Sequence, residues 1–463
     1  MTITPDDLAT LPGPRYLALA EAIAAAIRSG RLAEGAQLPT QRELAHRLGV
    51  TVGTVGRAYL LAEQRGLIAG EVGRGTFVRT AAPPARSLQI GDAADPAAVD
   101  LRVNAPSPTP VDAELTGAMA AFLAEPAALG LLRRYAPGPG LLRHREAAAR
   151  WLTADGIPAT AEGVVVTGGA QAGLGLALAT LAEPGDSVLV EQLAYPGLRE
   201  IAALLRLRLE GVAMDGHGLR PDALAESAAA SGARTLVVTP TLQNPTTLVM
   251  PDARRSEVAA VCRRLGLRVV EDDVYAQLVE PRPAPFAALL PELTLHLASL
   301  SKCVLPGLRL GFCAGPPALA AAVGRAMHAL RISESPLLAE LFCRWLDTGL
   351  IARAIAAQRA EATRRQALAR QVLAGLDLAA PSTGLHAWLR LPAGWRAGEA
   401  ERACEAAGAF VASAELFWFG KGAAPAALRL ALGRPESLEL LGRGLATVAG
   451  VLGGRPAAPL PVI

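Results

Sequence analysis

Short runs of β-forming residues alternate with helical segments over the middle of this 463-residue chain, and this alternation constrains the fold more than any other feature. The runs are residues 163–167, 187–191, 234–239, 267–271, 295–299 and 309–314. Strands separated by helical segments usually pair in parallel, since a crossover between parallel strands needs a dozen or more residues. We therefore expect an α/β domain with a parallel sheet.

A change of composition divides the chain. Residues 80–95 are rich in Ala, Pro and Ser, with Pro83-Pro84 at their centre, which is typical of a linker. A chain of this length also exceeds one ordinary hydrophobic core. The predicted parts are an N-terminal domain (1–79), a linker (80–98) and a second domain (99–463), whose large lobe covers about 110–345 and whose smaller α+β lobe covers about 346–463.

Composition narrows the function classes. The net charge of +3 is too small to indicate nucleic-acid binding without a local motif. The five cysteines are scattered and lack metal-ligand spacing, so we expect no metal site and a reducing compartment. Without a signal peptide or about 18 consecutive apolar residues, a cytoplasmic protein that does not enter a membrane is expected. Only Lys302 and Lys421 are lysines, so lysine-dependent chemistry has two candidates.

The N-terminal domain has the pattern of a winged helix-turn-helix, a mainly α unit. Apolar periodicity predicts a helix over residues 16–27. Thr40 caps a second helix that closes at Gly49, and Thr51 caps a third that runs to about Arg65. Two short β-runs, 67–68 and 76–78, then flank a Gly-rich tip, as in a wing.

Five ordered blocks of this domain resemble the GntR-type winged helix. They are Pro39-Thr40-Gln41-Arg42-Glu43-Leu44-Ala45, Leu48-Gly49-Val50-Thr51, Arg57-Ala58-Tyr59, Gly66-Leu67-Ile68 and Gly73-Arg74-Gly75-Thr76-Phe77-Val78. The resemblance implies double-stranded DNA as a partner, with the third helix in the major groove. The candidate DNA contacts are Arg42, Thr51, Thr54, Arg57 and, at the wing tip, Arg74. Taken singly, Thr51 is equally a helix cap and Arg57 a solvated side chain. Val52-Gly53 departs from the family, which commonly has Arg after the cap.

The run Ser299-Leu300-Ser301-Lys302, followed by Pro306-Gly307-Leu308-Arg309-Leu310-Gly311, resembles the active-site segment of fold-type I aminotransferases. The resemblance implies pyridoxal 5′-phosphate, held by Lys302 as a Schiff base (an internal aldimine). Such a lysine needs burial and nearby positive charge, and the apolar run before it and Arg309 after it supply both. Ser299, Ser301 and Arg309 are candidates for the cofactor phosphate.

Further blocks follow the order of that family. Val164 to Gln171 runs from a strand through a Gly-rich turn into a helix, which directs free N–H groups at an anion. The candidates there for the cofactor phosphate are Gly169, Ala170 and Gln171. Tyr195 matches the aromatic that stacks on the pyridine ring, although a tyrosine of this kind is equally a core residue.

Three polar residues match those that bind the cofactor ring. Asn244 and Tyr275 match residues that bind the phenolic oxygen, although an Asn-Pro turn explains Asn244 as well. Asp272 matches the carboxylate that pairs with the pyridine nitrogen, with Asp273 as the alternative.

Two further positions concern a neighbouring subunit and the ligand. Tyr135 resembles the tyrosine that reaches the phosphate of the partner subunit, which implies a homodimer. Arg429 occupies the position that holds the substrate α-carboxylate, although an arginine facing water at a strand edge explains it too.

The two resemblances together are those of the MocR/GabR regulators, which implies a transcription regulator with an amino compound or the cofactor as effector. A working aminotransferase with an appended DNA-binding domain is the alternative, because the catalytic set appears complete. A protein that responds to pyridoxal phosphate supply alone is a third.

Overall fold

The computed structural model describes residues 4, 14–28, 31–32, 36–64, 67–71, 75–78, 98–133, 135–330 and 332–454. The chain divides into two compact units, Met1–Ser87 and Leu88–Ile463. The first is called the reader domain below. Nearly all of the predicted linker (80–98) and the wing-tip Arg74 lie outside the described residues.

The reader domain has the helices and hairpin that the sequence predicts. It contains α2 (Arg15–Arg28), β1 (Gln37–Leu38), α3 (Gln41–Leu48), α4 (Val52–Gln64), β2 (Ile68–Glu71) and β3 (Gly75–Val78). The antiparallel sheet has the order β1-β3-β2, so β1 is a strand that the sequence analysis missed. Its core joins apolar residues of all three helices, including Leu19, Leu44 and Val55.

Local chemistry sets both ends of α3. The Thr40 side chain accepts from the Glu43 N–H, and the Glu43 carboxylate accepts from the Thr40 N–H, a reciprocal capping box. Gly49 ends the helix with φ of 62°, a left-handed conformation that suits glycine. The expected cap and stop are therefore confirmed.

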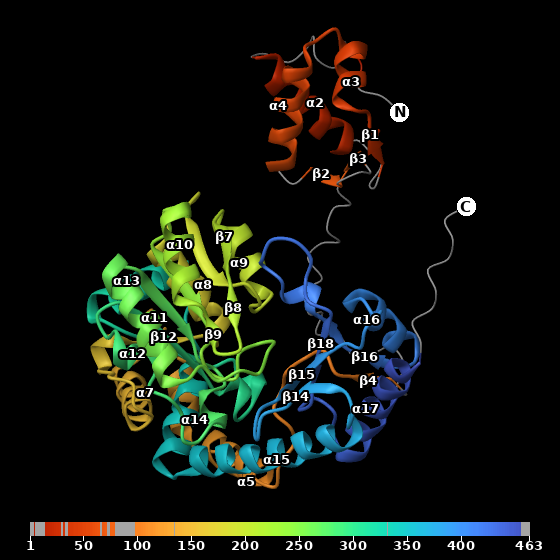
Figure 1. Cartoon of the computed structure of the whole chain (residues 1–463). Helices are drawn as coiled ribbons and strands as arrows, with labels where there is room; N and C mark the ends of the chain where they lie inside the picture. Colours follow the sequence, from red (N-terminus) through yellow and green to blue (C-terminus); the bar gives the residue numbers. More distant parts are fainter. Residues whose placement is uncertain are drawn as a thin grey trace. The chain divides into compact units, whose positions relative to one another are not determined.

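A seven-stranded sheet forms the centre of the second unit (Figure 1). Its order is β5 (Val164–Thr167), β13 (Gly311–Ala314), β12 (Thr294–Ser299), β11 (Arg268–Asp272), β10 (Thr235–Val238), β6 (Ser187–Glu191) and β7 (Arg208–Val212). Strand β13 is antiparallel to both neighbours, so the expectation of an all-parallel sheet is wrong at this strand. Only residues 300–310 join β12 to β13, which is too short for a helical crossover back to a parallel neighbour.

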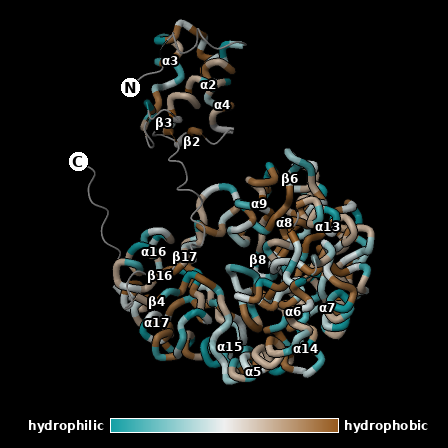
Figure 2. The backbone as a smooth tube through the Cα atoms, turned by 180° about the vertical axis from the view of Figure 1, so that it is seen from behind, coloured by the Kyte–Doolittle hydropathy of each residue, from teal (hydrophilic) through white to brown (hydrophobic). Residues whose placement is uncertain are grey.

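Helices cover both faces of this sheet. One core contains apolar residues of α8 (Ala170–Leu181), α9 (Gly197–Leu205) and α13 (Pro317–Ala329). The opposite face packs on α7 (Leu142–Ala154), α14 (Pro336–Asp347), α10 (Pro221–Ser231), α11 (Asp252–Leu265) and α12 (Phe286–Leu289). Figure 2 shows that α8 is largely apolar, as its position against the sheet requires.

A smaller lobe follows the long helix α15 (Leu350–Val372), which runs along the base of the unit (Figure 1). Its antiparallel sheet has the order β14 (Asp377–Ala379), β15 (His386–Arg390), β18 (Ala427–Ala431) and β17 (Ala412–Ser413). Helices α16 (Ala397–Ala406) and α17 (Leu438–Gly453) share a core with these strands. The parallel pair β4 (Val99–Asp100) and β16 (Ala409–Phe410) adds the first residues of the unit to this lobe.

The remaining elements among the described residues are two helices, a two-stranded hairpin and five 3₁₀ turns. They are α5 (Asp112–Leu123), α6 (Pro126–Leu132), the hairpin of β8 (Met214–Asp215) and β9 (Gly218–Leu219), and 3₁₀ turns at Ala161–Gly163, Ala276–Leu278, Leu300–Lys302, Pro306–Leu308 and Ala414–Phe417. Among the described residues no single helix is long and apolar enough to cross a membrane; α5 and α6 reach that length and composition only as a pair bent by 80°.

Candidate functional site

Lys302 lies just beyond the end of β12, in a 3₁₀ turn fixed by serine. The Ser299 hydroxyl accepts from the Ser301 N–H at 3.1 Å and donates to the Leu310 carbonyl at 3.0 Å, which holds the turn against the next strand. The Lys302 ammonium donates to the Asn104 carbonyl at 2.6 Å. Burial lowers the pKa of Lys302 to about 8, and the charge of Arg429 acts in the same direction. About a tenth of this amine is therefore unprotonated, and nucleophilic, at pH 7, far more than for an ordinary lysine with a pKa near 10.4.

Of the two adjacent carboxylates, Asp272 is the one whose charge is coupled to Lys302. Burial and the charge of Asp273 raise its pKa to about 6, against the opposing effect of Lys302. Its Oδ1 is buried and has no hydrogen-bond partner among the described residues. Asp273 instead contacts Arg282, with 3.4 Å between Oδ2 and Nη1. Asp273 Oδ1 is likewise buried and unpartnered, but the charge of Asp273 is already met by Arg282, so the geometry favours Asp272 as the partner of a protonated ring nitrogen.

A Gly-rich turn and an arginine lie together at the start of α8. Gly169 precedes the helix with φ of 86°, and the Arg309 guanidinium donates to the Gly168 carbonyl at 3.2 Å. A Cβ on Gly169 would lie 3.2 Å from Arg309 Nη2, and a Cβ on Gly311 would lie 2.8 Å from the Gly169 carbonyl carbon. Both glycines thus permit the close approach of the turn to Arg309. The arginine and the N-terminus of α8, with Ala170 and Gln171, form a cationic site that suits a phosphate.

The predicted aromatic and amide residues surround this site. The Tyr195 hydroxyl donates to Gln171 Oε1 at 2.6 Å, and burial raises the pKa of Tyr195 to about 12. The Tyr275 hydroxyl accepts from Asn104 Nδ2 at 3.0 Å. The Asp272 carboxylate acts on the pKa of both tyrosines, as expected for side chains that share one site.

Arg429 is fully buried, so the alternative of an arginine facing water is wrong. Its Nη1 donates to Asn244 Oδ1 at 3.2 Å, its Nη2 donates to the Arg102 carbonyl, and its Nε has no partner among the described residues. Burial lowers its pKa to about 10. A buried cation without a carboxylate partner is costly unless a ligand supplies the anion.

Some positions differ from their expected surroundings. Tyr135 is fully exposed, and within one chain no contact with the described residues joins it to the site. Ser299 uses its hydroxyl on the turn, so its contact with a phosphate stays a prediction. Two neighbours were missed: Asn104, and His386, whose ring lies 5.4 Å from that of Tyr275 and whose pKa burial lowers to about 3. No motif in the sequence indicated His386.

The candidate DNA contacts lie on the outside of the reader domain. Arg42, Thr51 and Arg57 are exposed, and Thr54 is half-buried. The hydroxyls of Thr51 and Thr54 lie 2.9 Å apart, and the Thr54 N–H donates to Thr51 Oγ1, so Thr51 also caps α4. Val52 is 45% exposed where the family commonly carries Arg. This helix face therefore offers hydroxyl groups and one arginine, together with an apolar side chain.

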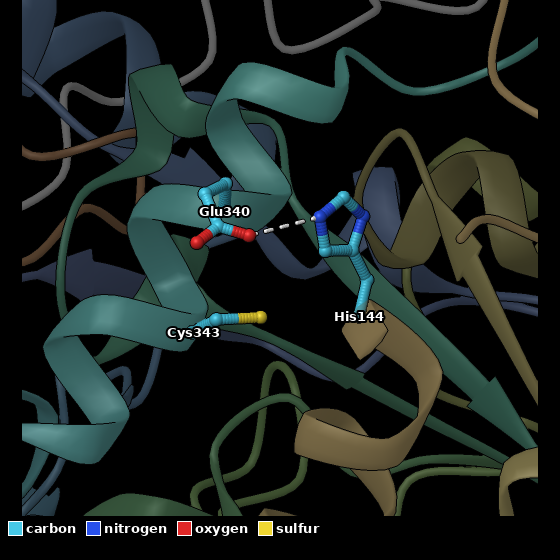
Figure 3. Close-up of side chains that lie close together, drawn as sticks. All are labelled: His144, Glu340 and Cys343. Carbon is cyan, nitrogen blue, oxygen red and sulfur yellow. Dashed lines mark ion pairs between the residues drawn. The ribbon is translucent and has the colours of Figure 1, made fainter. Parts of the chain in front are cut away.

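A second buried cluster, apart from Lys302, joins α7 to α14 (Figure 3). His144 Nε2 lies 3.4 Å from Glu340 Oε2, and Cys343 is the third member. Both oxygens of Glu340 already accept from Arg143 at 3.0 Å, and burial raises the pKa of the Cys343 thiol to about 12. The Glu340 carboxylate is already paired with Arg143 and the Cys343 thiol is protonated, so both are poor metal ligands. This cluster is best explained as non-covalent contacts that join the two helices.

Two family models match the chain. Residues 99–439 match "Aminotransferase class I and II", and residues 15–78 match "Bacterial regulatory proteins, gntR family". The HTH-type transcriptional regulator YdeF of Bacillus subtilis, which is named as uncharacterized, is 30% identical over 93% of this chain and 93% of its own length. The pyridoxine biosynthesis transcriptional regulator PdxR of Corynebacterium glutamicum and the transcriptional regulator TauR of Rhodobacter capsulatus are also 30% identical, over 64% and 74% of this chain and 65% and 76% of theirs.

Solved structures show the same fold for the second unit. An archaeal alanine:glyoxylate aminotransferase aligns with a TM-score of 0.70 at 23% identity, over 77% of this chain and 91% of its own. The α-aminoadipate aminotransferase LysN of Thermus thermophilus, complexed with N-(5′-phosphopyridoxyl)-L-leucine, aligns with a TM-score of 0.68 at 24% identity, over 77% and 92%. At these identities the likeness concerns the fold.

Proposed function

This chain belongs to the MocR/GabR-type regulators, in which a gntR-type winged helix is joined to an aminotransferase class I and II domain, and from that premise we propose that it regulates transcription in response to a ligand held at Lys302. One observation carries the proposal. The same chain presents an exposed helix face suited to DNA and a half-buried lysine of lowered pKa beside a carboxylate that has a buried, unpartnered oxygen. An enzyme needs only the second of these features.

The residues around Lys302 fit pyridoxal 5′-phosphate as the resident cofactor. Asp272 would hold a proton at the ring nitrogen, and Arg309 with the start of α8 would bind the phosphate. Tyr195 would stack on the ring, and Asn244 and Tyr275 would bind its phenolic oxygen. Bound there, the cofactor would supply an aldehyde that combines reversibly with amines and a ring that withdraws electrons.

The chain's own groups define the class of effector. Lys302, with a pKa of about 8, supplies an amine that is half unprotonated near pH 8. An incoming amino group can replace this amine on the cofactor aldehyde. Arg429 supplies a buried guanidinium with Nε unpartnered, which suits a carboxylate held by two parallel bonds. We infer an amino acid, or another small amine with an anionic group, as the effector, with the cofactor itself as the alternative signal.

On the DNA side, Arg42 and Arg57 would supply charge-assisted bonds to phosphates or base edges, and Thr51 and Thr54 hydroxyl contacts. Arg74 stays a prediction, since it lies outside the described residues. Val52 stands where the family commonly has an arginine, so one usual contact is missing. Loss of a good contact with a base edge weakens DNA binding by about 1–3 kcal/mol.

We also infer a homodimer in the cytoplasm. Leu129 and Leu132 on α6 and the following Tyr135 are large apolar side chains that are exposed in a single chain and that a second copy would cover. In a dimer, Tyr135 would meet the partner's site, as the resemblance implies. A bacterial regulator must also share a compartment with its DNA. Light scattering at micromolar concentration tests the dimer, which a monomeric mass would contradict.

A working aminotransferase is the second candidate. It is favoured by the complete set of Lys302, Asp272 and Arg429, because Lys302 with a pKa of about 8 can also act as general base. Conversion of the bound cofactor to its amine form by amino acids, with regeneration by a keto acid, would favour this candidate.

The test of the regulator is direct binding. The full chain should bind its own upstream DNA at least about a thousandfold more tightly than random DNA at physiological salt, and pyridoxal phosphate should change that affinity. Binding no tighter than to random DNA would remove the proposed function.

A further inference from the structure

One short segment contacts three of the predicted site residues. Residues Arg102–Pro106, here called the strap, follow β4. The Asn104 carbonyl accepts from Lys302 Nζ at 2.6 Å, the Asn104 side-chain amide donates to the Tyr275 hydroxyl at 3.0 Å, and the Arg102 carbonyl accepts from Arg429 Nη2. Two of these acceptors belong to the backbone, so they respond to the position of the strap whatever its side chains are.

Each of these bonds uses a group that a ligand would need. A carboxylate held at Arg429 by two parallel bonds must take donors of the guanidinium, and Nη2 is at present given to the strap. An amine at Lys302 that combines with an aldehyde no longer has three ammonium donors, so the Asn104 carbonyl loses its partner. Asn104 Oδ1 is buried and has no partner among the described residues, so this atom does not help to hold the strap in place.

The strap is fixed to the small lobe rather than to the large sheet. The Leu101 N–H donates to the Phe410 carbonyl, and the Leu101 carbonyl accepts from the Ala431 N–H, each at 2.8 Å. At the other end the Ser107 hydroxyl donates to the Gly433 carbonyl at 3.0 Å. The bonds from Asn104 to Lys302 and Tyr275 therefore join the strap to the large lobe, whereas Arg429, on β18, belongs to the small lobe.

The strap follows β4 (Val99–Asp100), the first described element after the predicted linker. Resting on the function proposed above, we propose that the strap is the contact through which occupancy of the Lys302 site acts on the linker and hence on DNA binding. Lys302 and Arg429 hold the strap as donors; pyridoxal phosphate at Lys302 would take the first donor, and a carboxylate at Arg429 would take the second. A ligand can shift this equilibrium only by the difference in its interactions with the two states, and the exchanged bonds provide that difference.

Gly433 offers a way to displace the strap without touching the site. A Cβ added there would lie 1.9 Å from the Ala105 carbonyl oxygen, so Gly433→Ala must push the strap away. Gly442 on α17 is the matched control, because a Cβ there meets only Leu368 Cδ2, at 3.9 Å. The measurement is the affinity of the full-length chain for its upstream DNA, by fluorescence anisotropy, with and without pyridoxal phosphate as the probe.

Wild type and Gly442→Ala should show a ratio of affinities of about 5–150-fold between the two conditions, the usual range of coupling between sites. Gly433→Ala should bind DNA with the cofactor-loaded affinity in both conditions, a ratio within about twofold, while its cofactor absorbance band persists. A Gly433→Ala ratio equal to that of wild type overturns the strap proposal alone. A wild type that binds DNA but shows no effect of pyridoxal phosphate removes the ligand-responsive function itself.

Hydrogen exchange on the wild type provides a second test that needs no stable variant. Loading with pyridoxal phosphate should accelerate exchange of the amides of residues 102–105 at least about threefold, while those of β10 and β11 in the sheet centre stay unchanged. Equal exchange of residues 102–105 in the loaded and unloaded chain overturns the proposal.

Discussion

The exposed face of α4 and the buried site at Lys302 are built in opposite ways. At the start of α4 the candidate DNA contacts are neighbours in sequence, as for Thr51 and Thr54, and Thr51 and Arg57 are exposed. At Lys302 several hydrogen bonds join residues far apart in the chain: Asn104 is 198 residues from Lys302, and Asn244 and Arg429 are 185 apart. The comparison teaches that DNA contacts can be changed with little effect on stability, whereas every charged group at the cofactor site also affects folding.

The largest effect is expected at Lys302. Lys302→Ala should abolish the absorbance band of covalently bound pyridoxal phosphate, because the only other lysine, Lys421, lies outside the site. Lys421→Ala is the matched control and should keep the band. A band that persists in Lys302→Ala, or that is lost in Lys421→Ala, contradicts the assignment.

The pH dependence of attachment tests the burial of Lys302. Only the unprotonated amine attacks, so below a pKa of about 8 the attachment rate should rise about tenfold per pH unit and level off near pH 8. An unburied lysine in a short peptide, with a pKa near 10.4, serves as the control, whose rate should continue to rise past pH 9. A protein rate that rises in parallel with the peptide would mean that burial does not lower the pKa.

Asp272→Asn should change ligand binding and stability in opposite directions. A hydrogen bond to a charged group contributes about 1.5–3 kcal/mol, so its loss should weaken pyridoxal phosphate binding about ten- to hundredfold. The folded state raises the pKa of Asp272 from 3.8 to about 6, so the folded chain binds this proton more tightly and loses stability as pH rises through that window. At pH 7.5 the unloaded variant should therefore gain about 1–3 kcal/mol, as measured by denaturation.

Asp273→Asn is the control for that experiment. Asp273 lies 3.4 Å from Arg282, so this variant should lose stability, because it removes one of the two carboxylates at this buried guanidinium and leaves only Asp155, at 2.9 Å. Its cofactor affinity should change less than about threefold. The reverse pattern, with Asp273→Asn losing the cofactor and Asp272→Asn keeping it, would assign the ring nitrogen to Asp273.

The sequence predicted what is local in both regions. Thr40, Gly49 and Thr51 act within a few residues, so the helices they delimit could be predicted, and the strand before Lys302 could be recognised by its apolar run. The two-residue β1 has no periodicity, and the edge strand β7 carries Arg208 and Glu210, so both escaped prediction. The direction of β13 depends on a connection length rather than on any residue type.

The site residues that lie in motifs at the ends of strands were predicted. The contacts that the backbone makes with the site were missed. Asp272 and Lys302 follow β-runs, so their convergence followed from the sheet. The Arg102 and Asn104 carbonyls carry no side-chain signature, since any residue type supplies the same oxygen. His386 comes from the small lobe, whose docking against Tyr275 no sequence pattern specifies.

For the reader domain the comparison predicts that substitution of an exposed side chain weakens DNA binding and leaves the stability of the fold almost unchanged. Arg57→Ala should weaken binding to the upstream DNA by about 1–3 kcal/mol, roughly 5–150-fold, because the side chain is exposed on α4 and free to reach the groove. Stability should change by less than about 0.5 kcal/mol. Arg443→Ala, an exposed arginine on α17 of the second unit, is the control and should bind as wild type does. Equal affinities for Arg57→Ala and Arg443→Ala would remove Arg57 from the interface.

The smallest effect is expected at the capping box, where the reader domain does have a residue whose contribution is to stability. Thr40→Ala removes the acceptor of the Glu43 N–H and should destabilise α3 by about 1 kcal/mol, which hydrogen exchange of the α3 amides in the full chain would report as about fivefold faster opening. Thr40→Ser keeps the hydroxyl and should restore protection. Since Tyr59 also donates to the neighbouring Pro39 carbonyl at 2.8 Å, the start of α3 should stay in place and DNA affinity should fall less than about threefold. A DNA loss as large as that of Arg57→Ala would mean that the cap positions the recognition helix as well, and that stability and binding are no more separable here than at Lys302.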